Sequence, residues 1–79
     1  MHPRIKIEVK LIDDNSEVHC NIQMNTKLGR VFAAYCARKA LALDSVRFRF
    51  DGMHIPSNVT AEDFGLEDGD RIDAMMIQM

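Results

Sequence analysis

The sequence of 79 residues predicts a single α+β domain, residues 1–79, in which one central helix packs across a mixed β-sheet. Three observations predict this fold class. Apolar and polar residues alternate at the start of the chain, as they do in half-buried strands. Apolar residues recur at helical spacing in the middle of the chain. They alternate again around a tight-turn signal in the second half.

The first two segments predict a β-hairpin. In "RIKIEVKLI" the apolar residues from Ile5 to Leu11 alternate with charged ones, which is typical of a strand with one buried face. The polar turn "DDNS" follows, and "EVHCNIQM" then alternates again. We expect this second strand, Glu17 to Met24, to lie at the edge of the sheet with unpaired backbone groups facing outward.

A helix is expected from Lys27 to about Ala40. It is preceded by Asn25 and Thr26, which are residue types that cap helix N-termini. Phe32 lies beside the apolar stripe of this helix, where we expect it to be half exposed. The stripe that should pack on the sheet consists of Leu28, Val31 and Tyr35.

The second half predicts another hairpin, a short helical turn and a final strand. Asp51 and Gly52 are a strong two-residue turn signal between "SVRFRF" and the short partner strand "MHI". Thr60 and Asp63 resemble a capping box for a helical turn that Gly65 closes. The final strand should turn Ile72, Ala74 and Met76 inward. Gln78 and Met79 add little to its pairing and are expected to fray.

The order of these elements is strand, strand, helix, strand, short strand, short helix, strand. Two hairpins that flank one helix give the β-grasp arrangement. The residues expected to be largely buried are Leu28, Val31, Tyr35, Phe48, Phe50 and Ile72.

Composition excludes several classes of function. The net charge of −2 argues against nucleic acid as a ligand, because phosphate binding requires a basic excess. No apolar run approaches the roughly 18 residues of a membrane span, and no signal peptide opens the chain. Two cysteines are too few for a disulfide scaffold, so a reduced, intracellular compartment is expected.

The sequence shows no pattern that predicts an enzyme, a metal or a cofactor. Cys20 and Cys36 fall on core-side positions and are interpreted as small core hydrophobes. Their spacing to the histidines matches no zinc signature, and His19 and His54 are expected to be solvated strand residues. Carboxylates lie mainly in turns and form no evident pair. A monomeric binding module is therefore expected.

Three strings carry a resemblance to a known family. They are "AYC-R" (Ala34 to Cys36, then Arg38), "SVRFRFDG" (Ser45 to Gly52) and "LEDGDRIDAM" (Leu66 to Met75). The chain resembles the small ubiquitin-like modifiers, SUMO, and its last string is similar to the plant members in particular. The resemblance implies post-translational modification of other proteins, recognition by SUMO-interacting peptides, and SUMO activating and conjugating enzymes as partners. It also implies a nuclear and cytoplasmic location.

The chain departs from the family pattern at three places. The family ends, after processing, in Gly-Gly, so covalent attachment to target lysines is expected only if Gly-Gly follows Met79. The long N-terminal extension is reduced to Met1 to Arg4. The second strand has Cys20, Asn21 and Gln23 where the family usually has a bulky aromatic residue and two lysines.

Two other functions stay open. Non-conjugating SUMO-like domains of larger genome-maintenance proteins lack the diglycine and act only through non-covalent contacts. Sulfur-carrier β-grasp proteins also need a terminal Gly-Gly, and their strings do not match this sequence.

Two surfaces are predicted to bind partners. An edge strand beside a helix that carries cations around an apolar floor suits an extended peptide with aliphatic and acidic residues. Spacing alone also fits a solvated helix face, and the resemblance favours a groove formed by Cys20, Asn21, Ile22, Gln23, Lys27, Arg30, Val31, Ala34 and Arg38. The resemblance further implies a conjugating-enzyme surface at Asp51, Gly52, Glu67, Asp68 and Asp70.

Overall fold

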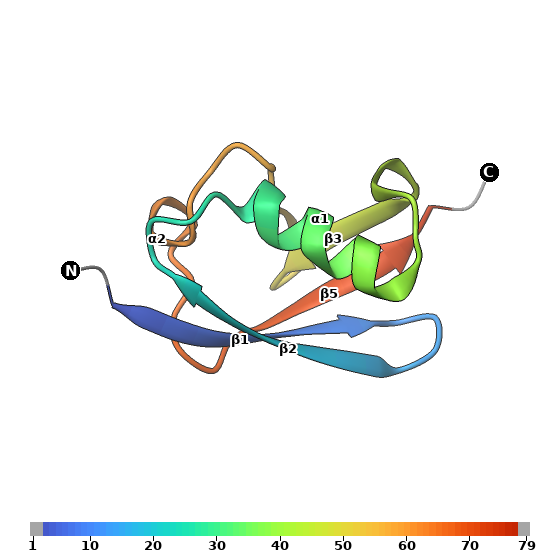
Figure 1. Cartoon of the computed structure of the whole chain (residues 1–79), viewed down its shortest axis with the longest axis horizontal. Coiled ribbons are helices and arrows are strands. Elements are labelled where there is room, and N and C mark those ends of the chain that lie inside the picture. Colours follow the sequence, from blue (N-terminus) through green and yellow to red (C-terminus); the bar gives the residue numbers. More distant parts are fainter. Residues whose placement is uncertain (1–2, 78–79) are drawn as a thin grey trace.

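The computed structural model describes residues 3–77, and these residues form one sheet with one long helix across it (Figure 1). The elements are β1 (Arg4–Leu11), β2 (Ser16–Gln23), α1 (Leu28–Lys39), the 3-10 turn η1 (Leu43–Ser45), β3 (Val46–Phe50), β4 (Met53–His54), α2 (Ala61–Phe64) and β5 (Arg71–Met76). Each strand and α-helix agrees with the element predicted from the sequence to within one or two residues, whereas the 3-10 turn was not predicted. The expected fraying of Gln78 and Met79 lies outside the described residues.

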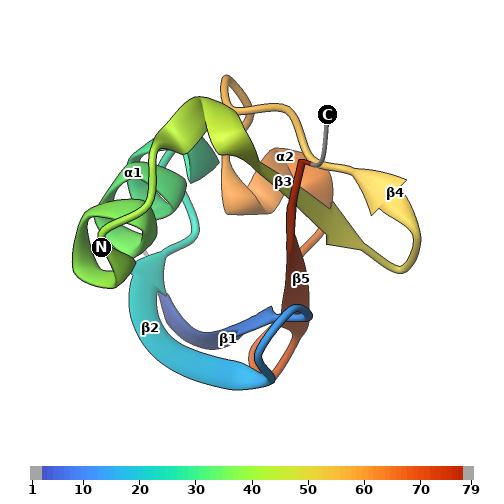
Figure 2. The ribbon, with the colours of Figure 1, turned by 90° about the vertical axis from the view of Figure 1, so that its right-hand side faces the viewer.

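The sheet has five strands in the order β2-β1-β5-β3-β4. The first and last strands, β1 and β5, are parallel neighbours at its centre, and every other pair is antiparallel. Figure 2 shows that the strands curve and that α1 lies on the inner side of the curve. This arrangement confirms the predicted α+β, β-grasp fold.

The core forms where the alternating strand residues meet the helix. Ile7, Val9 and Ile72 are at most 1% exposed. From the helix, Leu28 and Tyr35 pack against them as the stripe predicts. Burying such apolar side chains supplies the main driving force for folding.

The prediction for Phe32 was wrong. Its side chain is 3% exposed and stacks on Phe48, with ring centroids 3.9 Å apart. The helix therefore buries a wider stripe than the three predicted positions. Phe50, expected to be largely buried, is only partly buried and meets Phe64 edge to face.

The N-terminus of α1 is not capped by a polar side chain as predicted from Asn25 and Thr26. The N-cap residue is Lys27, which makes no side-chain capping bond. The free helical amides of Leu28 and Gly29 instead donate to the backbone carbonyls of Val59 and Ser57, at 2.8 and 2.9 Å. A tertiary loop thus satisfies donors that would otherwise require a local cap.

This loop approaches the helix closely at Gly29. A Cβ atom at that position would lie 2.8 Å from the Ser57 carbonyl oxygen, so the contact requires glycine. The opposite end of α1 is tied to the β1–β2 turn, where the Lys39 ammonium donates to Ser16 Oγ at 2.6 Å and lies 3.7 Å from Asp14.

The turn signals are confirmed. Thr60 and Asp63 form the complete capping box of α2, and Gly65 ends this helix in the left-handed conformation. Asp51 and Gly52 both have positive φ, at 53° and 80°, as the tight turn between β3 and β4 requires. Among the described residues, no helix is long and apolar enough to span a membrane.

Candidate functional site

The second strand is an open edge of the sheet. All eight residues of β2 pair with β1, and no other strand in the described part of the chain pairs with it. Its second row of backbone donors and acceptors is therefore available. An edge of this length is an obvious place for an extended peptide to add a strand.

A cleft of about 450 Å³ lies between this edge and α1. Its floor is apolar, because Ile22 from β2 and Val31 from α1 are only 9% and 6% exposed. Exposed residues surround the floor, among them Arg30 and Ala34 on the helix. The residues that line the cleft are Arg4, Cys20, Asn21, Ile22, Gln23, Thr26, Arg30, Val31 and Ala34.

Seven of the nine predicted groove residues line this cleft, and Lys27 and Arg38 do not. Both are exposed residues of the same helical region. The backbone of Lys27 forms an isolated antiparallel β-bridge with Thr60 at the start of the helix. Arg38 lies close enough to Cys20 that its positive charge favours the thiolate. Of the three predicted cations, Arg30 therefore lines the cleft, whereas Lys27 and Arg38 do not.

Sequence reasoning missed Arg4 and Thr26 as lining residues. Arg4 belongs to β1, but it pairs with Gln23 at the end of the β1–β2 ladder and so reaches the cleft. This register was the signal that could have found it. Thr26 was interpreted as a helix cap, and it instead forms part of the wall between β2 and the helix.

The two cysteines differ in their surroundings. Cys36 is 2% exposed, as expected for a small core hydrophobe, whereas Cys20 is half-buried and lines the cleft. Burial raises the pKa of the Cys20 thiol, and the charge of Arg38 only partly opposes this. Burial also raises the pKa of Cys36. Both thiols are therefore protonated at neutral pH, and Cys20 presents a weakly polar surface to the cleft.

The predicted acidic surface lies at one end of the sheet. Register places the β3–β4 turn, with Asp51 and Gly52, at the same end as the loop that precedes β5. Within that loop Asp68 accepts a bond from the Lys6 amide at 2.7 Å, and Asp70 accepts one from the Glu67 amide at 2.8 Å. Asp68 and Asp70 therefore shape the loop.

A second cleft, of about 220 Å³, lies on the other flank of α1. The sequence did not predict it. Apolar side chains from the helix, the 3-10 turn and β3 form most of its wall. The lining residues are Gly29, Phe32, Leu43, Val46, Phe48, His54, Ile55 and Ser57.

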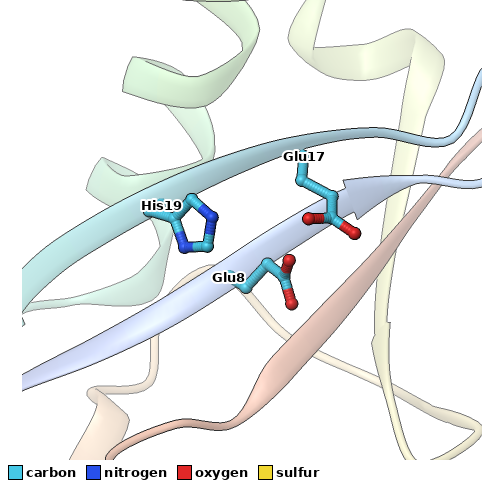
Figure 3. A group of neighbouring side chains, drawn as sticks. All are labelled: Glu8, Glu17 and His19. Carbon is cyan, nitrogen blue, oxygen red and sulfur yellow. The ribbon is translucent and has the colours of Figure 1, made fainter.

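The expectation that no carboxylates form a pair was wrong. Glu8 on β1 lies beside Glu17 on β2, and His19 completes the group (Figure 3). The donor atoms of all three side chains lie within 4.8 Å of one another. Spacing along the chain could not reveal this cluster, because cross-strand register brings the residues together. His19 and His54 are both exposed, as expected.

Comparisons with known proteins agree with this structure. Residues 5–76 match the family model described as "Ubiquitin-2 like Rad60 SUMO-like". The chain is 39% identical over 74 residues to small ubiquitin-related modifier 2 of Arabidopsis thaliana. These aligned residues cover 94% of this chain and 71% of that protein. The solved structure of the Caldiarchaeum subterraneum ubiquitin is similar in fold, with a TM-score of 0.89 and 24% identity over 98% of each chain.

A mixed sheet that curves around one helix, with an open edge strand beside that helix, is the ubiquitin-like fold. Within this class, the family match over residues 5–76 and the identity to the Arabidopsis modifier place the chain more narrowly. It belongs to the SUMO-like family. The resemblance inferred from the three sequence strings is thereby confirmed.

Proposed function

We propose that this chain is a protein-interaction module, not an enzyme, that binds extended, aliphatic-rich peptides along β2 in the manner of SUMO-type modifiers. The open eight-residue edge of β2 beside an apolar floor is the observation that carries this proposal. Backbone bonds from the edge supply affinity, and the floor at Ile22 and Val31 selects aliphatic side chains. The contact area is small, so we expect micromolar binding.

The test is a titration of the chain with such a peptide while its amide resonances are recorded. Shifts are expected around Ile22, Arg30 and Arg38. Shifts that cluster at Asp51 and Asp70 would show that the groove is assigned to the wrong surface.

Two neighbouring alanines supply a matched pair of variants. Ala33 and Ala34 are both exposed on α1, and only Ala34 lines the cleft. The change Ala34→Glu should weaken peptide binding at least about tenfold, because an unpaired charge over an apolar floor costs more than about 1.4 kcal/mol. The change Ala33→Glu should leave the affinity within about twofold. Equal losses in both variants would contradict the proposed groove.

We further propose that the acidic end of the sheet contacts a basic surface of a conjugating enzyme. Asp51 and Glu67 are exposed, and within residues 3–77 neither side chain forms an ion pair or a hydrogen bond that would occupy it. The change Asp51→Lys should reduce binding to the conjugating enzyme in a pull-down titration. Asp44→Lys, at an exposed acidic position in η1, is the control that should bind normally.

The Arabidopsis relative is named as a modifier, which supports a second proposal: the chain becomes covalently attached to lysines where Gly-Gly follows Met79. A chain extended by Gly-Gly should form an ATP-dependent thioester with the SUMO activating enzyme. An authentic SUMO protein is the positive control in the same reaction. If only the control forms the thioester, the remaining candidate is a non-conjugating SUMO-like domain of a larger protein.

A further inference from the structure

We propose that Glu8, Glu17 and His19 form a binding site for a divalent transition-metal ion of the zinc class on the solvent-facing side of the β1–β2 hairpin. The site lies on the face of the hairpin opposite to the buried core residues. It is separate from the peptide groove, none of whose lining residues belongs to it.

The positions of the three ligands follow from strand geometry. Glu17 and His19 are two residues apart on β2, so their side chains point to the same face. Glu8 lies directly opposite His19 in the ladder, where Cβ atoms are about 4.5–5.5 Å apart. The ladder has eight consecutive residue pairs, from Arg4 with Gln23 to Leu11 with Ser16. The backbone beneath the three side chains is therefore well supported.

The charges of the cluster favour a cation. Lys10 lies opposite Glu17, and Arg71 on β5 lies opposite Glu8, yet neither carboxylate forms an ion pair in the described part of the chain. The Arg71 side chain instead lies 3.6 Å from Asp73. The two carboxylates lie close to each other, with the imidazole of His19 beside them, as Figure 3 shows.

The geometry of the two carboxylates favours a bound cation. Their oxygens lie within 4.8 Å of each other, and two like charges this close repel each other. A metal ion bound between them would relieve this repulsion.

The donor set selects the class of metal. One imidazole nitrogen and two carboxylates suit zinc, which binds such ligands at about 2.0–2.2 Å and accepts water in a fourth position. Magnesium and calcium prefer oxygen ligands throughout. The donor atoms lie within 4.8 Å of one another, so rotation of three solvent-facing side chains is enough to bring them around one ion.

The experiment is a titration of the full chain with Zn²⁺, followed by calorimetry and by amide shifts. Shifts should centre on Glu8, Glu17 and His19, and Mg²⁺ at the same concentration should not reproduce them. The change His19→Gln should weaken Zn²⁺ binding at least about tenfold, since even the loss of an outer-shell partner costs 10–100-fold. The change His54→Gln, at an exposed histidine on β4, should have no effect.

Two further variants test the other donors that the chain offers. His2→Gln and Cys20→Ser should both bind Zn²⁺ as the unmodified chain does. Loss of binding in either variant, or retained affinity in His19→Gln, would overturn the proposed site. Circular dichroism serves as a readout that all variants are folded, and peptide binding by the unmodified chain should not change with Zn²⁺.

Discussion

The two flanks of α1 differ in what covers them. On one flank the carbonyls of Ser57 and Val59 accept hydrogen bonds from the helix N-terminus, Phe32 stacks on Phe48, and only the smaller cleft of about 220 Å³ remains. On the other flank the helix faces the unpaired edge of β2 across a cleft of about 450 Å³. We call these the closed flank and the open flank.

The difference teaches that one helix can stabilise the domain on one side and leave the other side available for a partner. On the closed flank, the helical amides of Leu28 and Gly29 are hydrogen-bonded to the loop, and two stacked aromatic rings add to the core. The open flank leaves backbone groups unpaired and keeps cations such as Arg30 in solvent. Mutations on the closed flank should therefore change stability, and mutations on the open flank should change binding.

The largest effect is expected from Phe48→Ala on the closed flank. Phe48 is 4% exposed and contacts the rings of Phe32 and Tyr35, so its removal should cost about 3–5 kcal/mol of unfolding free energy. A domain of 79 residues has only about 4–12 kcal/mol in total. Urea denaturation followed by circular dichroism measures this cost. Phe50→Ala, at a half-buried ring, is the matched control and should cost clearly less.

A second prediction concerns Gly29→Ala. Helix propensity alone would favour alanine by about 1 kcal/mol. The added Cβ would meet the Ser57 carbonyl oxygen at 2.8 Å, so we expect a net loss of about 1–3 kcal/mol in the same denaturation experiment. The reverse change at an exposed helical site, Ala33→Gly, should cost about 1 kcal/mol from propensity alone. If Gly29→Ala stabilised the protein, the closed flank would not be tightly packed.

A third prediction tests the open flank with Arg30→Gln. An exposed charge pair contributes about 0.2–1 kcal/mol, so affinity for a peptide with acidic residues should fall by no more than about fivefold. Unfolding free energy should change by less than about 0.5 kcal/mol. Arg47→Gln, an exposed arginine on β3 outside the cleft, should alter neither quantity. A large stability loss in Arg30→Gln would break the division between the flanks.

The smallest effect on stability is expected when low pH protonates Asp14, which takes part in the link between α1 and the β1–β2 turn. Hydrogen bonds from the Ser16 side chain and amide hold the pKa of Asp14 below its usual value of 3.8, and Lys39 adds to this effect. Because the folded pKa is depressed, the stabilisation is fully present above pH 3.8 and is lost as pH falls through the lower folded pKa. The pKa of Glu8 is raised in the folded protein, so protonation of Glu8 favours the folded state as the pH falls.

The variant Asp14→Asn isolates the contribution of Asp14. It should lose less stability than the unmodified chain when the pH is lowered from 5 to about 2, as measured by urea denaturation at each pH. Identical pH profiles for the two proteins would show that the Asp14–Ser16–Lys39 link adds nothing measurable.

Sequence periodicity was sufficient to predict most of the fold. The alternation of apolar and polar residues predicted β1, β2 and β5, because each strand has one face on the core. The turn signal at Asp51 and Gly52 predicted the second hairpin. These features are local. Each can be recognised within about ten residues of chain.

The features that could not be predicted depend on contacts between distant segments. Phe32 is buried because Phe48 lies over it, and the helix needs no polar cap because the loop at Ser57 supplies carbonyls. Arg4 reaches the cleft through its pairing with Gln23. The Glu8 cluster likewise depends on the β1–β2 register. Local pattern identifies strands and helices, and it leaves open which side chains become neighbours.

The parallel pairing of β1 with β5 has a consequence for mechanical resistance. Glu8 pairs with Arg71 and Leu11 with Ala74, so Arg4 and Met76 extend from opposite ends of the paired segment. A force that pulls these two residues apart slides the strands along each other and loads all of their hydrogen bonds at once. The antiparallel β3–β4 hairpin, pulled at its open end, would lose its bonds one after another. We therefore expect this small domain to resist being drawn through the pore of an unfolding machine until the β1–β5 ladder ruptures in a single step.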